Sequence, residues 1–178
     1  LYCWGFNSYG QLGNGTSSQT SRLSATVPTS LTDDRKATAI AIASYHMCAI
    51  LDNGSVNCWG LNDNGVLGDG TTTTRYTPTY TASLGAGRTA VSLSVHNGNS
   101  CAILDNGSVS CWGYNGDGQI GDGTTTSPRL TPTGTASLGI GRTATSISSG
   151  SNFVCTILDD GSVKCWGHND YGQLGDGS

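Results

Sequence analysis

Cysteine is the residue of this chain whose spacing most clearly indicates chemistry. Six of the seven cysteines form three pairs with the same separation, and each pair brackets a short Asp-Asn-Gly or Asp-Asp-Gly turn that is typical of a β-hairpin. A three-residue turn places the two cysteines of a pair opposite each other, about 4.5–5.5 Å apart, and a disulfide can bridge that distance. We therefore predict three hairpin disulfides: Cys48–Cys58, Cys101–Cys111 and Cys155–Cys165.

Cys3 is left over by this pairing. By the same spacing its partner lies before residue 1. Three interpretations stay open: the chain is part of a longer repeat protein whose preceding segment supplies the partner, a neighbouring protomer supplies it through an intermolecular bond, or Cys3 is a free structural thiol.

The remaining reactive side chains do not form a recognisable site. The three histidines, His46, His96 and His168, occupy unrelated positions in the repeat described below. The cysteine spacing is not that of a Cys-x-x-Cys zinc or redox motif, and the sequence has no nucleophile elbow, phosphate loop or dinucleotide fingerprint. We predict no catalytic residue, no cofactor and no metal site, and hence no enzyme.

Recurring Gly-Asp-Gly triplets offer a second candidate chemistry. Asp69, Asp122 and Asp176 lie between glycines, and Asn14 takes this place in the first copy. Carboxylates beside glycine turns suit calcium, but the spacing is not that of an EF-hand and one copy lacks the charge. Turn formation is the favoured interpretation.

Glycosylation is the modification that the sequence suggests. Asn14-Gly15-Thr16 is an N-glycosylation acceptor, whereas the similar triplets at Asn53 and Asn106 coincide with hairpin turns. Threonine tracts beside prolines are typical of O-glycosylated loops, although they also read as unmodified surface loops. The candidate residues are Asn14, Thr71, Thr72, Thr73, Thr74, Thr124, Thr125 and Thr126.

Composition limits the fold and the partners of this chain of 178 residues. All 12 acidic residues are aspartate and only Lys36 and Lys164 are lysine, so the residues that build exposed helix faces are missing. The net charge is −4 without a basic cluster, which argues against a nucleic-acid partner. No apolar run approaches the ~18 residues of a membrane span, so we expect no membrane insertion.

A repeat of about 54 residues organises the chain as one array over residues 1–178. Trp-Gly pairs recur at spacings of 55, 53 and 54 residues, which gives units of approximately 4–58, 59–111 and 112–165 and a partial unit 166–178. Each unit contains a hairpin and an upstream segment with alternating large and small residues, typical of sheets packed on one another. We predict an all-β fold with these residues buried: Ile50, Val56, Leu93, Val95, Ile103, Val109, Ile147, Ile157 and Val163.

The two ends of the chain duplicate each other, since residues 1–16 match residues 163–178. Both ends therefore contain the same part of the repeat, and neither supplies what the other lacks. We expect an open array that does not close into a ring on its own.

The repeat resembles that of the regulator of chromosome condensation family. The resemblance rests on Cys-Trp-Gly-x-Asn-x-x-Gly-Gln-Leu-Gly-Asp-Gly-Thr together with Cys-Ala-Ile-Leu-Asp-Asn-Gly-Ser-Val, and it covers essentially the whole chain. It implies a β-propeller of four-stranded blades, seven in a full ring. The paired cysteines resemble those of the secreted microbial branch rather than the nuclear members.

Two functions follow from this interpretation. The first is a non-enzymatic extracellular structural protein that self-assembles into a filament or surface layer through its open blade ends, with itself as partner. The alternative is an extracellular protein-binding propeller module, this chain being part of a longer closed propeller and another extracellular protein the partner. Nuclear guanine-nucleotide exchange is excluded because disulfides do not persist in that reducing compartment.

Overall fold

A computed structural model describes residues 1–29 and 31–178, and it is built almost entirely from strands. A short 3-10 helix at Thr32–Asp34 accompanies the strands of the described residues. The strands are β1 (Cys3–Asn7), β2 (Ser18–Thr26), β3 (Ala37–Ile42), β4 (His46–Leu51), β5 (Val56–Gly60), β6 (Arg75–Tyr80), β7 (Ala90–His96), β8 (Asn99–Leu104), β9 (Val109–Gly113), β10 (Arg129–Gly134), β11 (Ala144–Ser149), β12 (Phe153–Leu158) and β13 (Val163–Gly167).

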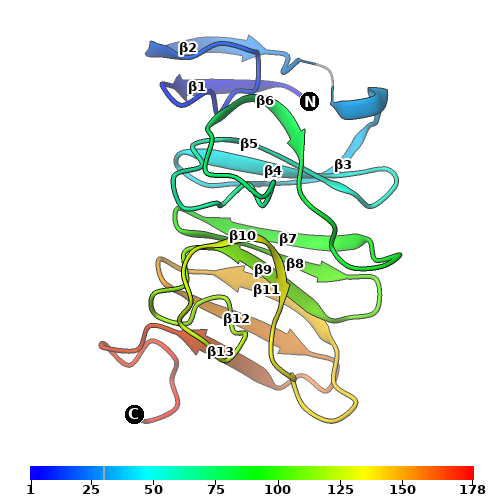
Figure 1. Ribbon diagram of the computed structural model, residues 1–178, viewed down its shortest axis with the longest axis vertical. Helices are drawn as coiled ribbons and strands as arrows, with labels where there is room; N and C mark the ends of the chain where they lie inside the picture. Colours follow the sequence, from blue (N-terminus) through cyan, green and yellow to red (C-terminus); the bar gives the residue numbers. More distant parts are fainter. Residues whose placement is uncertain (30) are drawn as a thin grey trace.

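The strands form four antiparallel sheets that lie one after another along the long axis of the molecule (Figure 1). Two sheets are complete, with the strand orders β3-β4-β5-β6 and β7-β8-β9-β10. The outer two are smaller: β1 pairs with β2, and β11, β12 and β13 form a three-stranded sheet. The predictions of an all-β fold and of blades that do not close into a ring are confirmed.

Each sheet is centred on a hairpin whose turn fixes the register. In β4 and β5, Cys48 lies opposite Cys58 and Ile50 opposite Val56. The turn between them places Gly54 at a φ of 76°, which glycine adopts without steric cost. The same register recurs between β8 and β9 and between β12 and β13.

The sequence repeat and the sheets are out of phase. The unit that spans residues 4–58 begins in the sheet of β1 and β2, continues through β3 and β4, and ends in β5. A sequence period therefore supplies the last two strands of one sheet and the first two of the next, so the chain links neighbouring sheets through each period.

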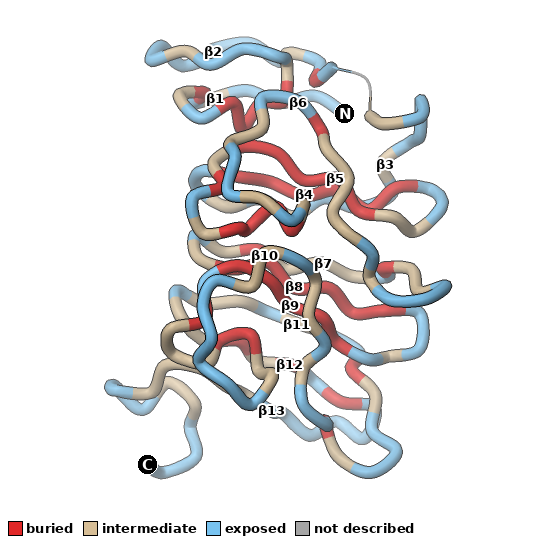
Figure 2. Tube along the Cα trace, viewed as in Figure 1, coloured by how far each residue is buried: buried red, intermediate tan, exposed pale blue. Residues whose placement is uncertain are grey.

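The hydrophobic core lies between the sheets and not inside any one of them. The largest cluster joins Ile50 and Val56 of one complete sheet to Ala102 and Trp112 of the other. Buried residues accordingly concentrate on the two middle sheets, while the outer strands are largely exposed (Figure 2). Each sheet depends on its neighbours for burial.

The burial predictions hold in the middle of the stack and fail at its end. Burial is confirmed for Ile50, Val56, Val95, Ile103 and Val109. Leu93 and Ile147 are only half-buried, and the prediction is wrong for Ile157 and Val163, which are 44% and 61% exposed. The corresponding residues of the sheet β3–β6 are covered by the next sheet, whereas β11–β13 is the last sheet of the stack.

Candidate functional site

The joint between neighbouring sheets is the most regular site in the molecule. In the first joint, the indole N–H of Trp59 in β5 donates to the carbonyl of Gln11, 3.0 Å away, in the loop after β1. Gly13 of that loop packs directly against the indole, because a Cβ at this position would be only 2.6 Å from the Trp59 Nε1. Glycine is required there both by this close approach and by a φ of +69°.

The same joint recurs twice along the chain. Trp112 donates to the carbonyl of Val66 at 2.8 Å, and Trp166 donates to the carbonyl of Gln119 at 3.0 Å. Gly68 and Gly121 pack on these two indoles as Gly13 packs on Trp59. The row of tryptophans thus fills the gaps between sheets.

A second contact completes the joint on the fourth strand of the following sheet. The amide of Gly15 donates to the carbonyl of Tyr76 in β6 at 2.9 Å, and the amide of Gly70 donates to the carbonyl of Leu130 in β10 at 3.0 Å. Gly10 lies against the side chain of Tyr76 in the same manner. One loop therefore contacts two strands of its neighbour.

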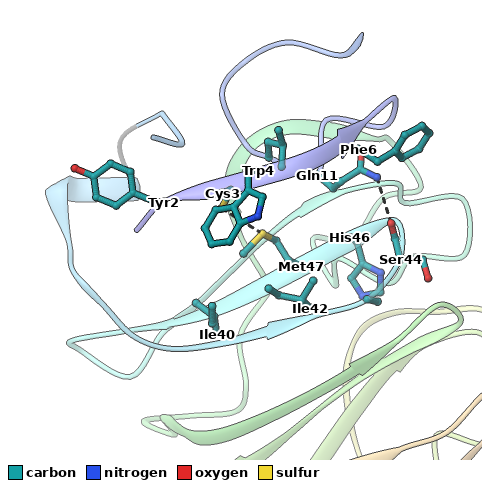
Figure 3. A pocket seen from close by; sticks show the side chains of 12 residues that line it. Tyr2, Cys3, Trp4, Phe6, Gln11, Ile40, Ile42, Ser44, His46 and Met47 are labelled. Carbon is teal, nitrogen blue, oxygen red and sulfur yellow. Dashed lines mark hydrogen bonds between the residues drawn. The ribbon is translucent and has the colours of Figure 1, made fainter. Parts of the chain in front are cut away.

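The sheet of β1 and β2 has exposed apolar side chains where the complete sheets have buried ones. Trp4 is 66% exposed and Leu23 is 95% exposed, whereas Trp59 and Trp112 are fully buried. The free edge of β1 also opens onto an apolar groove of about 310 Å³ between β1, β3 and β4. Figure 3 shows that Trp4, Ile40, Ile42 and Met47 line this groove.

Cys3 lies in the same groove. Its side chain is buried, and its Sγ is 4.0 Å from the Sδ of Met47 (Figure 3). Burial raises the pKa of this thiol, although the positive N-terminus opposes the shift. The group is therefore a thiol and not a thiolate at neutral pH, which makes it a poor nucleophile.

The C-terminal loop lacks the close glycine packing of the loops inside the joints. The loop at residues 172–177 repeats the pattern of residues 10–15, and no atom would lie within 4 Å of a Cβ at Gly172, Gly175 or Gly177. An open groove lined by Trp166 and by Thr124–Thr126 lies beside β13, the third strand of the sheet β11–β13.

The aspartates of the Gly-Asp-Gly triplets stabilise these loops by accepting hydrogen bonds. Asp69 accepts hydrogen bonds from the amide and hydroxyl of Thr71 and from Arg75, at 3.0, 2.7 and 2.7 Å. Burial raises the pKa of this carboxyl, but the bonds from Thr71 and Arg75 outweigh it and hold the pKa below its usual value. Asn14 accepts the same two bonds from Thr16. Within the described residues, no group of three or more histidine, cysteine or acidic side chains could hold a metal ion.

The structure places the remaining sequence candidates apart from one another. Disulfides join Cys48 to Cys58, Cys101 to Cys111 and Cys155 to Cys165. The threonines Thr124, Thr125 and Thr126 are exposed, as are Thr72 and Thr73, while Asn14, Thr71 and Thr74 are half-exposed. Glycosylation of these residues stays a prediction.

His46, for which the sequence predicted no catalytic or metal-binding role, lies in a joint between sheets. It is fully buried, and its Nε2 lies 3.0 Å from the hydroxyl of Ser100 in the next sheet. Because that hydroxyl donates to the carbonyl of Val66 at 2.8 Å, the imidazole donates to it. His168 lies far along the chain, beside Gln173 and Asp170. The sequence signal for this role is a position in the repeat. His46 lies opposite the glycine of a Trp-Gly pair, and the next sheet has Asn99 at the same position.

Comparison with known families accounts for this architecture. The regulator of chromosome condensation (RCC1) repeat matches residues 1–50, 53–103 and 106–157. The chain belongs to the RCC1 repeat family. A second description of the same repeat matches residues 37–66, 91–119 and 144–173, which are the segments that contain the hairpins. The predicted family is confirmed.

Curated relatives match most or all of the chain at low identity. The ultraviolet-B receptor UVR8 of Arabidopsis thaliana is 29% identical over 177 residues, which are 99% of this chain and 39% of UVR8. The E3 ubiquitin-protein ligase HERC2 of Homo sapiens is 29% identical, with 100% of this chain matching 4% of that protein. A protein RCC2 homolog of Danio rerio is 31% identical over 75% of this chain and 26% of its own length. The chain thus spans less than half of each relative.

Solved structures show the same fold. Prp20p of Saccharomyces cerevisiae superposes with a TM-score of 0.81 at 23% identity, over 98% of this chain and 42% of Prp20p. Human WBSCR16 superposes with a TM-score of 0.80 at 21% identity, over 91% of this chain and 41% of that protein. The Prp20p structure is described with its binding to Gsp1p and histones, so this type of propeller includes protein-binding members. Within the described residues, no helix is long and apolar enough to cross a membrane.

Proposed function

We propose that this chain is a non-enzymatic, extracellular structural module that associates with further copies of itself through its open ends. One observation carries the proposal: the outer sheets expose apolar residues whose equivalents in the complete sheets are buried. Trp4 and Val163 are 66% and 61% exposed, whereas Trp59 and Val56 are 0% and 1% exposed. Large exposed apolar surfaces of this kind mark interaction sites.

The open edges support association in a second way. In the described part of the chain, β1 pairs only with β2, so its other edge has unpaired backbone groups beside the groove. A free edge is a template for another strand. Cys3 lies on this edge. We propose that it forms a disulfide with a cysteine of a preceding segment or of a neighbouring protomer.

An extracellular location is supported by the three disulfides. Such bonds form and persist in oxidising compartments and are rare in the cytosol and nucleus. They distinguish this chain from a nuclear exchange factor, despite the family name.

A second candidate function is an extracellular protein-binding propeller of which this chain is part. It is favoured by the short length of this chain relative to similar proteins, since the chain matches only 39% of UVR8 and 42% of Prp20p. In that case other blades of the same protein cover the exposed residues, and exposed loops bind a different protein.

Sedimentation velocity over a wide range of protein concentration tests the proposal. We expect species heavier than the 18.2 kDa chain, which increase with concentration and persist in a Cys3→Ser variant, because apolar contacts and not the thiol drive association. A single species of one chain at all concentrations would contradict self-association and favour the second candidate.

A further inference from the structure

Six asparagines of this chain are followed directly by glycine: Asn14, Asn53, Asn64, Asn97, Asn106 and Asn115. In such a pair the backbone nitrogen of the glycine can attack the side-chain carbonyl carbon of the asparagine, because glycine has no Cβ to hinder the approach. The attack requires that nitrogen to be free of other bonds. The hydrogen bonds of the six glycine amides therefore decide which pair reacts in the folded chain.

Most of these pairs are held in an unreactive state. Four of the glycine amides donate to a backbone carbonyl at 2.8 to 3.0 Å: those of Gly15, Gly54, Gly65 and Gly107. A fifth pair is shielded by burial, since the Asn115 side chain is fully buried and its Oδ1 accepts a hydrogen bond from the amide of Ile120 at 2.9 Å. The sixth pair, Asn97 and Gly98, has neither protection.

Asn97 and Gly98 form the turn between β7 and β8. The turn consists of these two residues alone, because His96 and Asn99 on either side of it are register partners. Among the described residues, the Gly98 amide has no hydrogen-bond acceptor, and the Asn97 side chain is exposed. The attacking nitrogen is therefore free, and water reaches the amide group that must leave.

A hydrogen bond from the neighbouring sheet acts on the Asn97 side chain. The amide of Ser44, in the turn between β3 and β4, donates to the Oδ1 of Asn97 at 3.0 Å. This bond stabilises the negative charge that develops on Oδ1 when the carbonyl carbon is attacked, as backbone amides do in an oxyanion hole. It also joins the two complete sheets, so a reaction at Asn97 alters a contact between them.

We infer that Asn97–Gly98 is a modification site at which the folded chain deamidates faster than at its other asparagine–glycine pairs. The Gly98 nitrogen gives up its proton and forms a bond to the Cγ of Asn97. The bond between Cγ and Nδ2 breaks, and Nδ2 leaves with that proton as ammonia. Water then opens the resulting succinimide. Cleavage at Cγ gives aspartate, and cleavage at the backbone carbonyl carbon of residue 97 gives isoaspartate.

The two products differ in their effect on the contact between the sheets. Aspartate keeps an oxygen in place for the Ser44 amide, and its charge strengthens the bond. Isoaspartate routes the backbone through the side-chain methylene and so lengthens a turn of only two residues. Because the Gly98 carbonyl accepts a hydrogen bond from the Tyr114 amide at 2.7 Å, the longer turn displaces that bond as well. We expect isoaspartate, and not aspartate, to destabilise the fold.

Timed incubation of the folded, disulfide-bonded chain at mildly alkaline pH tests the site. After reduction and tryptic digestion, the peptide 89–129 contains both Asn97 and Asn106, so one peptide compares the free pair with a hydrogen-bonded pair. Electron-transfer fragmentation locates the change and distinguishes isoaspartate from aspartate. We expect Asn97 to deamidate about threefold to tenfold faster than Asn106, since no hydrogen bond of the glycine amide must be broken first.

Two controls show whether the fold selects the site. In the reduced chain in urea, the two rates should converge, because both asparagines precede glycine. In the folded chain, Gly98→Ala should slow the reaction, since its methyl group hinders the attack. A Cβ at Gly98 would be 3.8 Å from the nearest atom, an ordinary contact, so this variant keeps the fold. Gly134→Ala has open space around it and should leave the rate unchanged.

Equal rates at Asn97 and Asn106 in the folded chain would overturn the inference, as would a preference for Asn97 that persists in urea. Denaturant unfolding tests the effect on the contact between sheets. The aged chain should unfold at a lower midpoint than the fresh chain, whereas fresh Asn97→Asp and aged Gly98→Ala should keep their midpoints. An aged chain that contains isoaspartate and is as stable as the fresh chain would overturn the assigned effect.

Discussion

His46 links two sheets through one buried hydrogen bond, and its burial has a consequence for acid stability. Desolvation, together with the nearby His96, lowers the pKa of His46 from 6.5 to about 3. The unfolded chain therefore binds a proton on this ring near pH 6.5, whereas the folded chain does so only near pH 3. Because the unfolded state binds more protons between these values, stability is lost as the pH falls through this window.

We predict that the free energy of unfolding falls by about 2 kcal/mol between pH 7 and pH 5 because of this single site. Denaturant unfolding at the two pH values measures it. His46→Asn should reduce the difference because asparagine does not titrate, and the fold accommodates an asparagine at the same position, Asn99, in the next sheet. An unchanged difference in His46→Asn would show that another group is responsible.

Asp69 accepts the hydrogen bonds of a turn and also forms an ion pair, and two different substitutions separate these contributions to stability. Asp69→Asn keeps an acceptor for Thr71, as Asn14 does for Thr16, but it removes the ion pair with Arg75, which joins the two groups at 2.7 Å. We predict a loss of about 0.5–1 kcal/mol for Asp69→Asn and a larger loss for Asp69→Ala, which also removes the hydrogen bonds of the turn. Asp63→Asn on the exposed surface is the control. Equal losses in the Asn and Ala variants would mean that the charge alone is important.

Among the structural elements, the disulfide-bonded hairpin is the one that recurs, since three of the sheets contain it. Reduction of a disulfide that closes a loop of this length is expected to cost about 2–3 kcal/mol. We predict that Cys48→Ala/Cys58→Ala lowers the free energy of unfolding by at least this much, because both sulfurs are fully buried and their removal also leaves a cavity.

The terminal hairpin provides the comparison. Cys155 and Cys165 are half-exposed, so Cys155→Ala/Cys165→Ala should lose only the loop-closure part. Peptide mapping of the unchanged chain under non-reducing conditions identifies the pairs directly. Cross-sheet pairing, or free thiols at these six positions, would contradict the account of the hairpins.

The hairpins were predictable from sequence because their signals are local. The Asp-Asn-Gly turn fixes the register within a few residues, and the alternation of Ile50 and Val56 follows from it. The joints were not predictable in the same way. Trp59 and its acceptor Gln11 are 48 residues apart, and the pattern of residues 10–13 indicates a turn without indicating what packs on it. Burial of Ile157 and Val163 failed for a related reason, since the sequence of one unit does not state whether another sheet follows.

For the whole molecule, stability and association have the same origin. Every sheet buries its faces only against its neighbours, so the apolar residues of the first and last sheets stay exposed in a single copy (Figure 2). The first and last sheets of the described residues carry exposed Trp4 and Leu23 at one end and Ile157 and Val163 at the other, which is why the proposal places the interaction surfaces on these sheets and not on the threonine-rich loops.

Electron microscopy of the folded, disulfide-bonded chain tests this central claim most directly. The account predicts particles in which copies meet end to end, the sheet β11–β13 of one copy against the sheet β1–β2 of the next, as open rows or closed rings. Single copies, or copies joined side by side through the loops with both ends left uncovered, would contradict it.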